Sequence, residues 1–428
     1  MSLDFERCVA EEYCIKVADG THDSPKEVDY GKKLVTSKNI IGGKLDLDKS
    51  YFISLDDFDD INKRSKVDQW DILISMIGTV GEVALITEKP DFAIKNVGLL
   101  KNNNEYKAKW LYYYLKSDLG QYQIKSRLRG TTQLYIPLKD LRKIEISVPK
   151  DHDDMIKIIK ILDNIDKKIE NNLNINNNLD DLLDLLFKVN FIDKFNNDDT
   201  NWKNRKIGEL PLIITDYVAN GSFASLKENV SILDYEDYAY FIRNTDLKSK
   251  CFEKFVNKHS YDFLKKSSLF GNEIIISNVG DVGSVFLCPF LDKPMTLGNN
   301  MILVKSDNDA IYLNFYLFLL FRSNYGKYLI STITTGSVQS KFNKTEFKSL
   351  ELIMPDDDLI IKFNKIVSPI FEYKNKISDE ITNLTKLRDI LLPKLMSGEI
   401  DVSKINCDLK LIIKKIILKF INHFIWRI

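Results

Sequence analysis

The sequence is poor in the side chains that most often bind metals or act as catalytic nucleophiles and bases. Its 428 residues include four histidines and five cysteines, and both types are scattered along the chain. The cysteines form no CxxC pair and are odd in number, so neither a disulfide framework nor a zinc site is indicated. We therefore expect a reduced, cytoplasmic protein with no bound metal.

Several motifs of catalytic and nucleotide-binding sites are also missing. The chain has no GxxxxGKS/T phosphate loop, no GxGxxG turn after a strand, no HExxH pair and no Gly-x-Ser-x-Gly elbow. The Asn/Asp-Pro-Pro-aromatic run that is usual in amino-methyltransferases is absent too. Together with the scarcity of histidine, these absences favour a binding protein over an enzyme.

Neither end of the sequence predicts a membrane segment. The N-terminal stretch is acidic and has no apolar centre, so it does not resemble a signal peptide. The stretch from Leu409 to Ile428 is apolar, but four lysines and an arginine interrupt it, and a spanning helix needs about 20 mostly uncharged residues. We interpret this tail as a basic amphipathic helix, and we expect no membrane partner.

The net charge indicates no partner by itself. Lys+Arg and Asp+Glu both total 61, so the formal net charge is zero. This balance counts mildly against a protein that coats DNA, although it leaves room for local basic faces. The length predicts about two to four domains. A hydrophobic content of 44% is ample for their cores.

The most informative feature that the chain does have is an internal repeat. The segment Gly130–Pro149 reads GTTQLYIPLKDLRKIEISVP, and Gly336–Pro355, 206 residues further on, reads GSVQSKFNKTEFKSLELIMP. A glycine, a glutamine, several apolar positions and the closing proline recur at the same offset. Two similar halves in one chain indicate pseudo-two-fold symmetry, which suits a two-part or symmetric partner.

The first 149 residues are typical of mixed α/β structure. Apolar runs at 70–76 and 83–86 flank Gly78 and Gly81, which predicts a strand, a tight turn and a second strand rather than a phosphate cradle. Apolar residues three or four apart predict a helix over 109–128. Four aspartates at 56, 57, 59 and 60 are interpreted as a solvated turn.

Residues 202–355 repeat this order of elements. The run EIIIS at 273–277 matches DILIS in the first half, and Gly280 and Gly283 match the first pair of glycines. An aromatic helix is predicted again, over 313–328. The offset drifts from 202 to 206 residues, which is typical of small insertions in loops.

A helical segment with sustained heptad spacing follows each half, as in a coiled coil. Because a globular half separates the two segments, the simplest partner for each is the other, in antiparallel orientation. We call the positions along which they meet the seam. The apolar residues predicted for the seam are Leu162, Ile165, Ile169, Leu179, Leu183 and Leu186 in the first segment and Val367, Ile370, Ile377, Ile381, Leu384 and Leu391 in the second.

Two asparagines, Asn172 and Asn176, also fall on the seam. Buried asparagines commonly fix the register of a coiled coil at a cost in stability. The asparagine-rich composition of the region explains them equally well. A helix of about 35 residues would span ~50 Å, so such a pair could hold two heads at a set separation.

These patterns predict an α+β protein with a pseudo-two-fold repeat. Two mixed α/β domains, 1–149 and 191–355, would be joined by two long antiparallel coiled-coil helices at 150–190 and 356–400. Residues 401–428 would form the basic apolar tail.

Positive charge is concentrated over both copies of the repeated motif. Segment 125–143 has six basic residues and one acid, and segment 322–348 has five and one, whereas 150–188 has nine acids and six bases. Lysine and arginine neutralise DNA phosphates and so give affinity without sequence choice. The predicted phosphate contacts are Lys125, Arg127, Arg129, Arg142 and Lys143 in the first half and Arg322, Lys327, Lys341, Lys344 and Lys348 in the second.

Sequence choice needs groups that read base edges. Glutamine can bind adenine bidentately. However, a glutamine stands at the same place in both halves, Gln133 in the first and Gln339 in the second, which favours a loop-shaping or phosphate-proximal role. His22 has no catalytic partner nearby, which favours a structural or DNA-contacting loop over a general base. Better candidates for base readout are the polar segments that differ between the halves: Asp19–Lys26, Thr36–Gly43, Asn220–Lys227 and Arg243–Lys248.

Several distinctive segments occur in a fixed order along the chain. These are DGTHDSPK with SKNI, then DILISMIGTVGEV and its echo EIIISNVGDVGSV, then RGTTQ and TTGSVQ before each long helix, and LRDILLPKLMSGEI near the end. With these segments the chain resembles the specificity subunits of type I restriction–modification systems, and the likeness covers about residues 4–400. The tail beyond Ile400 departs from the family pattern.

The resemblance implies a DNA-binding subunit without a catalytic centre. Each of its two target-recognition domains would read one half of a split sequence in double-stranded DNA. Its two long helices would pack as a spacer and dock two methyltransferase (modification) subunits, through which restriction subunits join. The resemblance implies S-adenosylmethionine, ATP and magnesium for the partner subunits, and no cofactor for this chain.

Two other functions stay open at this stage. A two-headed coiled-coil scaffold without a DNA role would show the same repeat and the same heptads. An enzyme with an unrecognised nuclease site would cut or methylate DNA without any partner subunit.

Overall fold

The computed structural model describes residues 3–194, 202–307, 310–336 and 339–402. The chain forms two compact units: unit 1 comprises Met1–Glu170 and Thr382–Ile428, and unit 2 comprises Asn171–Ile381. The first and the last of the described residues therefore both belong to unit 1. The two boundaries between the units fall inside long helices.

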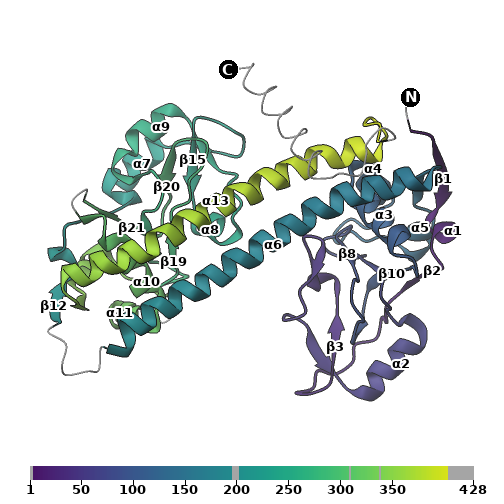
Figure 1. Ribbon diagram of the computed structural model, residues 1–428, viewed down its shortest axis with the longest axis horizontal. Helices are drawn as coiled ribbons and strands as arrows, with labels where there is room; N and C mark the ends of the chain where they lie inside the picture. The colour runs from purple at the N-terminus through teal and green to yellow at the C-terminus, as the bar shows by residue number, and fades with distance from the viewer. Residues whose placement is uncertain (1–2, 195–201, 308–309, 337–338, 403–428) are drawn as a thin grey trace. The chain divides into compact units, whose positions relative to one another are not determined.

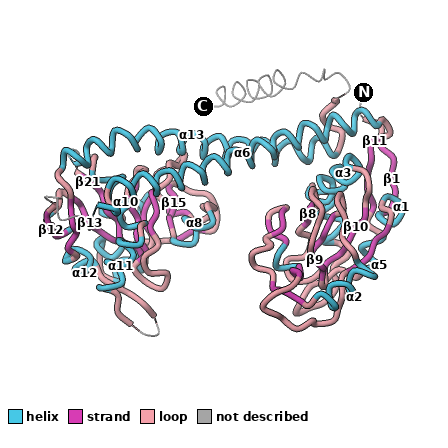
Figure 2. The backbone as a smooth tube through the Cα atoms, turned by 60° about the horizontal axis from the view of Figure 1, so that its bottom comes forward, coloured by secondary structure: helices cyan, strands magenta, loops and turns pink. Residues whose placement is uncertain are grey.

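Unit 1 carries the first set of strands. These are β1 (Phe5–Val9), β2 (Lys16–Asp19), β3 (Lys32–Val35), β4 (Ile40–Ile41), β5 (Lys44–Leu45), β6 (Tyr51–Ile53), β7 (Ile72–Ser75), β8 (Val83–Leu85), β9 (Phe92–Ile94), β10 (Val97–Lys101) and β11 (Glu145–Pro149). The main sheet is antiparallel, with strand order β2-β10-β7-β8. A second sheet has the order β6-β3-β9, and β1 lies alongside β11 (Figure 2).

The short helices of unit 1 are α1 (Ala10–Tyr13), η1 (Ser37–Asn39), α2 (Leu55–Ser65), α3 (Glu105–Lys116), α4 (Asp118–Lys125) and α5 (Leu138–Arg142). Strand β7 is buried along its whole length, as its continuous apolar run predicts. It joins Trp110 of α3 and Ile158 of the first long helix in one core.

Unit 2 carries the second set of strands. These are β12 (Lys203–Lys206), β13 (Leu212–Asp216), β14 (Ile232–Leu233), β15 (Ala239–Ile242), β16 (Phe255–Val256), β17 (Ser268–Leu269), β18 (Ile274–Ser277), β19 (Val285–Leu287), β20 (Met295–Leu297), β21 (Met301–Ser306) and β22 (Glu351–Met354). Its antiparallel sheet, β13-β21-β18-β19, repeats the order of the main sheet of unit 1. The predicted repeat of the element order is therefore confirmed, and both halves have mixed α and β content.

The short helices of unit 2 are η2 (Ile192–Lys194), η3 (Ile207–Glu209), η4 (Tyr217–Asn220), α7 (Phe223–Asn229), α8 (Asn244–Ser249), α9 (Lys258–Phe263), η5 (Lys265–Ser267), α10 (Leu313–Arg322), α11 (Asn324–Ile333) and α12 (Lys344–Ser349). A five-stranded sheet of order β14-β16-β15-β20-β17 completes the unit.

The aromatic helix expected as one element in each half is broken into two. Ser117 separates α3 from α4, and Ser323 separates α10 from α11; each serine side chain caps the second helix by accepting a hydrogen bond from a glycine N–H. A Cβ at either glycine, Gly120 or Gly326, would stand 2.1 Å from a carbonyl oxygen of the preceding helix. The corner therefore depends on a serine cap and a close backbone approach, which helical periodicity does not detect.

The aspartates at 56–60 do not form the expected turn. They lie in the first turns of α2, where Ser54 caps the helix by accepting a hydrogen bond from the Asp57 N–H at 3.1 Å. Carboxylates are favoured at a helix N-terminus because they face the positive end of the helix dipole. The acidic cluster is therefore a helix start.

Two long helices contribute to both units: α6 (His152–Asn190), of 39 residues, and α13 (Asp357–Met396), of 40 residues (Figure 1). In unit 1 the first part of α6 packs with the last part of α13, for example Leu162 with the cluster that holds Leu391. In unit 2 the last part of α6 packs with the first part of α13, for example Leu183 with the cluster that holds Val367. The two helices are thus antiparallel within each unit.

The residues predicted for the seam are mostly enclosed. Leu162, Ile165, Leu183, Val367, Ile377, Leu384 and Leu391 are buried, and Ile169, Leu179, Leu186, Ile370 and Ile381 are half-buried. Both seam asparagines are buried as well and bond to α13: the Nδ2 of Asn172 donates to Glu380 at 2.8 Å, and that of Asn176 donates to Ser378 at 3.2 Å.

Among the helices that the structure describes, none is long and apolar enough to cross a membrane. The tail from Leu409 to Ile428, interpreted above as a basic amphipathic helix, lies outside the described residues.

Candidate nucleic-acid interface

The repeated motif forms the same closed loop in both units. Arg129 and Tyr135 exchange two backbone hydrogen bonds of 2.8 and 2.9 Å, and Thr335 and Lys341 exchange two of 2.9 Å. The glycine that follows the first residue of each pair has a positive φ, 95° at Gly130 and 98° at Gly336. The repeat therefore preserves the two closing backbone bonds and the left-handed glycine beside them.

The backbone of the glutamine lies so close to the glycine of the motif that no larger residue fits at the glycine position. A Cβ at Gly130 would stand 2.3 Å from the carbonyl oxygen of Gln133, and a Cβ at Gly336 would stand 2.4 Å from that of Gln339. Only glycine tolerates both the left-handed conformation and this close approach. Both glutamine side chains are exposed, and neither hydrogen-bonds to a residue in the described part of the chain. The backbone of each glutamine shapes the loop, and its side chain stays accessible.

Each loop lies against the tight turn between two strands of the main sheet. In unit 1 the Ile136 N–H donates to the Met76 carbonyl at 3.0 Å, and in unit 2 the Gly280 N–H donates to Ser340 at 3.0 Å. The glycines Gly78, Gly81, Gly280 and Gly283 all have positive φ, between 77° and 96°. The predicted strand, turn and strand are confirmed, and each unit presents two adjacent loops at one end of its sheet.

In unit 1 the predicted basic residues have two different kinds of surroundings. The guanidinium of Arg127 donates to the carbonyls of Gln123 and Lys143 at 2.9 and 3.0 Å, and that of Arg142 donates to Val17 at 3.2 Å, so both brace backbone. Arg129 pairs with Asp140 at 3.2 Å and keeps 59% of its side chain exposed. Lys125 and Lys143 are exposed and have no carboxylate partner among the described residues.

In unit 2 the basic residues divide in the same way. Arg322 is held by Asp180 and Asp184 of α6, at 2.7 and 2.6 Å, and is 24% exposed, so its donors serve the protein itself. Lys344 pairs with Asp216 at 3.1 Å. The exposed residues that have no carboxylate partner in the described ranges are Lys327, Lys341 and Lys348.

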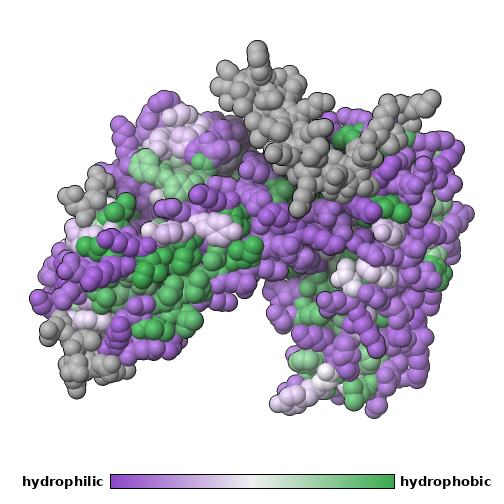
Figure 3. Space-filling view, in the orientation of Figure 1, coloured by the Kyte–Doolittle hydropathy of each residue, from purple (hydrophilic) through white to green (hydrophobic). Residues whose placement is uncertain are grey.

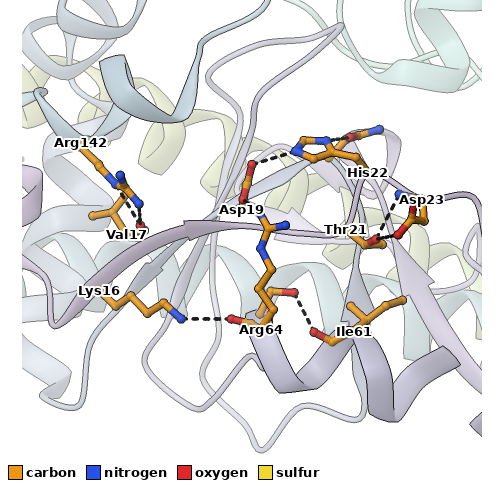
Figure 4. Close-up of polar contacts among 11 residues, drawn as sticks. Lys16, Val17, Asp19, Thr21, His22, Asp23, Ile61, Arg64 and Arg142 are labelled. Atoms are coloured by element: carbon orange, nitrogen blue, oxygen red, sulfur yellow. Dashed lines mark hydrogen bonds and ion pairs between the residues drawn. The ribbon is translucent and has the colours of Figure 1, made fainter. Parts of the chain in front are cut away.

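A network that sequence reasoning missed lies at the end of β2 in unit 1 (Figure 4). The carboxylate of Asp19 accepts a hydrogen bond from Arg64 at 2.5 Å and lies 3.0 Å from the ring of His22. The second ring nitrogen of His22 lies 2.8 Å from Asn96. Arg64 and Asn96 are 45 and 77 positions from Asp19, and no local pattern marks either of them.

The other segments proposed for base readout are held by bonds within each segment and by bonds to distant residues. Asn220 donates from its Nδ2 to the Ser267 hydroxyl at 2.8 Å, and Lys248 pairs with Asp281 at 2.6 Å. Asn39 accepts hydrogen bonds from the backbone and side chain of Thr36 at 2.8 and 2.9 Å, which fixes the start of 36–43. Arg243 pairs with Asp246 at 2.5 Å, which fixes the start of 243–248.

The described residues contain no group of three histidine, cysteine or carboxylate side chains placed to hold a metal ion. Cys8, Cys14, Cys251 and Cys288 are free thiols.

Comparison with known proteins gives a match over most of the chain. The family model described as "Type I restriction modification DNA specificity domain" matches residues 23–180 and 199–383. The chain is 26% identical over 321 residues, 70% of each protein, to the type I restriction enzyme MjaIX specificity subunit of Methanocaldococcus jannaschii. It is 28% identical over 170 residues to the type I restriction enzyme HindI specificity subunit of Haemophilus influenzae, which is 39% of this chain and 36% of that protein.

A similar fold is known from a crystal structure of the S subunit of a type I restriction–modification system from M. genitalium. The TM-score is 0.55 at 17% identity, and the alignment covers 92% of this chain and 96% of that one.

Proposed function

The chain belongs to the family of type I restriction modification DNA specificity domains and is a specificity subunit, which is not an enzyme by itself. On this premise we propose that it reads a bipartite target in double-stranded DNA, one half with each unit. The observation that carries the proposal is the duplicated loop. Both units present the same glycine-closed loop beside the same sheet turn. The polar segments that precede it differ between the units.

The shared loop suits contact with the DNA backbone. Phosphates are the same at every step of a duplex, so a contact that both halves need can be built from the same residues. In the proposal the exposed basic residues around the loops grip phosphates: Lys125, Arg129 and Lys143 in unit 1 and Lys327, Lys341 and Lys348 in unit 2. Arg127, Arg142, Arg322 and Lys344 mainly support the surface from within. Gln133 and Gln339 lie close to the phosphates.

The finer architecture is part of the same proposal. Helices α6 and α13 form an antiparallel coiled coil that sets the spacing between the half-sites, with domain limits at 149, 190, 355 and 400. The heptad spacing and the enclosed seam residues support this. A scaffold without a DNA role has no comparable support, because the family is defined by DNA specificity.

The proposed partners are two methyltransferase subunits, which dock on the long helices and bring the restriction subunits. The seam residues are enclosed, so other side chains must form the docking face. On the face of unit 2 in Figure 3, hydrophobic side chains gather over the long helices. The exposed apolar residues of these segments include Leu182, Leu185, Val189 and Ile366, between 40% and 57% exposed. S-adenosylmethionine, ATP and magnesium would be bound by the partners, and the complex would work in the cytoplasm.

Mapping methylated adenines in the genome of the source organism tests the bipartite target. The expected result is one motif with two short specified parts and a fixed gap, which disappears when this chain is deleted. A contiguous motif, or no change on deletion, would contradict the proposal.

A salt titration tests the backbone contacts. Replacing Arg129 and Lys143 with alanine should weaken binding to all duplexes alike and reduce the slope of log K against log salt by about two. Lys150, which is paired with Asp4 at 2.8 Å, is the control position. An unchanged slope in the double variant would remove these residues from the DNA contact.

A further inference from the structure

The carboxylate of Asp19 is nearly enclosed, yet it holds two side chains that are open to solvent. Asp19 is 5% exposed at the end of β2. One of its oxygens accepts a hydrogen bond from the Nη2 of Arg64 at 2.5 Å, and the other lies 3.0 Å from the Nε2 of His22. The side chains of Arg64 and His22 are 60% and 64% exposed.

We propose that Arg64 reads a guanine in the half-site recognised by unit 1, and that Asp19 and His22 are positioning residues that fix its guanidinium. The inference rests on the proposed reading of DNA by unit 1, and it names one contact and the base that the contact selects.

The guanidinium of Arg64 is fixed by a chain of hydrogen bonds that begins at Asn96. Asn96 has a left-handed φ of 53°, and its N–H donates to the carbonyl of Thr21 at 3.1 Å. Its side-chain oxygen lies 2.8 Å from the Nδ1 of His22, so the imidazole is held at both nitrogens and in turn confines one oxygen of Asp19. Backbone strain of this kind persists only where the surroundings enforce it.

The backbone of Arg64 is held from the other side. The Nζ of Lys16 donates to the Arg64 carbonyl at 3.1 Å, which ties the end of α2 to the strand that carries Asp19 (Figure 4). Both the Cα and one Nη of Arg64 are therefore restrained, while the rest of the side chain faces solvent.

Such restraint favours base reading over phosphate contact. A phosphate is bound well by a flexible lysine, and the unit already exposes Lys125 and Lys143 near its shared loop. Fixing an arginine removes side-chain entropy, which is useful where the direction of its donors decides the outcome. Two parallel N–H groups of arginine match the O6 and N7 acceptors of guanine in the major groove.

The corresponding position in unit 2 is built differently. Asp216 ends β13 as Asp19 ends β2, but it binds the ammonium group of Lys344 and caps η4 through the Ala219 N–H at 2.9 Å. An ammonium group is a point charge without a planar fork. Unit 2 thus has no counterpart of Arg64 at this position, and the guanine contact proposed for Arg64 concerns one half-site.

The test compares Arg64→Lys with Lys63→Ala in the full-length chain, assembled with its methyltransferase subunits. Lys63 is the adjacent residue of α2, and its one ion-pair partner within the described ranges is the exposed Asp60, at 2.6 Å. Binding is measured on duplex libraries in which each position of the mapped target is randomised in turn. Arg64→Lys should reduce the preference for guanine at one position of one half-site by roughly 5- to 150-fold. The other half-site and the salt slope should stay as in the wild type, and Lys63→Ala should match the wild type throughout.

Asp19→Asn, which keeps the shape but not the charge, should relax the same position by a smaller factor. If Asp19→Asn folds poorly, Arg64→Lys still tests the inference, because the side chain of Arg64 is mostly solvent-exposed. Equal weakening of all duplexes by Arg64→Ala, with the salt slope reduced by about one, would show a phosphate contact and overturn the inference. Unchanged preference in Arg64→Lys would overturn it too. A wild type without any sequence preference would instead refute the proposed function.

Discussion

Asp180 offers a sharp test of how the second recognition unit is held to the long helices. Its carboxylate on α6 accepts a hydrogen bond from Arg322 of α10 at 2.7 Å and also binds Lys374 of α13. The side chains of Arg322 and Lys374 are 24% and 17% exposed. Replacing Asp180 with asparagine leaves Arg322 with Asp184, at 2.6 Å, but leaves the enclosed Lys374 without its carboxylate.

The magnitude follows from this enclosure. Removing one partner of a fully buried ion pair costs about 3–5 kcal/mol, because the other charge stays buried and unpaired. Asp180 is 35% exposed, so water screens part of the interaction, and a loss of about 2 kcal/mol is expected. The neighbouring Asp181 is exposed and has no ion-pair partner in the described part of the chain, so Asp181→Asn should change stability by less than about 0.5 kcal/mol.

The same pair of variants predicts a dependence on pH. Burial raises the pKa of Asp180, but the hydrogen bonds from Arg322 and Lys374 outweigh this and hold the pKa below its usual value. A lowered folded-state pKa gives stability that is fully present above the unfolded-state pKa, about 3.9, and is lost as the pH falls through the folded-state value. The difference in stability between the wild type and Asp180→Asn should therefore be constant above about pH 5 and shrink in more acidic solution.

Urea denaturation of the full chain, followed by circular dichroism between pH 7 and pH 3, measures both quantities. Hydrogen exchange of the α6 amides near residue 180 locates the effect in unit 2. Equal stabilities of the two asparagine variants at pH 7 would refute the reasoning. So would a difference from the wild type that does not shrink in acid.

Three further predictions concern the loops and the long helices. Gly130→Ala should weaken DNA binding several-fold more than Gly78→Ala in a binding titration, because both glycines have positive φ but nothing lies within 4 Å of a Cβ at Gly78. Asn176→Leu should raise the stability of unit 2 by about 1 kcal/mol in urea unfolding, because the buried Oδ1 of Asn176 has no hydrogen-bond partner in the described structure. Deletion of one matched heptad from both long helices should change the gap of the methylated motif and keep its two specified parts; changed half-sites with a constant gap would contradict the spacer.

The parts of the fold that the sequence predicts are those that depend on residues close together in the chain. Heptad spacing marks the long helices, and glycine pairs between apolar runs mark the sheet turns, because both depend on neighbours a few residues apart. The corner at Ser117 is not predicted, since the aromatic pattern continues through a serine cap.

The candidate site was less predictable, because charge in a sequence does not show what a side chain binds. Arg322 belongs to a basic segment, yet its partners lie 138 and 142 residues away on α6. Likewise, Arg64 lies in no recognisable motif, and its bond to Asp19 forms only because the fold brings α2 next to β2. The repeated glycine and glutamine stand out in the sequence, but their shared role is a backbone contact that depends on how the loop folds.

The membership of α13 in the core of unit 1 has a consequence for how the protein is made. Leu391 and Leu395 lie in the same core as Ile158 and Leu162, so the unit that begins the chain is completed by nearly its last described residues. At about 5–20 residues per second, a ribosome needs roughly 10–45 s to synthesise the stretch between Glu170 and Met396. Throughout that time the nascent unit 1 would expose the apolar stripe of α6. Synthesis of this chain therefore creates a long interval in which a chaperone, or the α6 of a second nascent chain, can cover the stripe first.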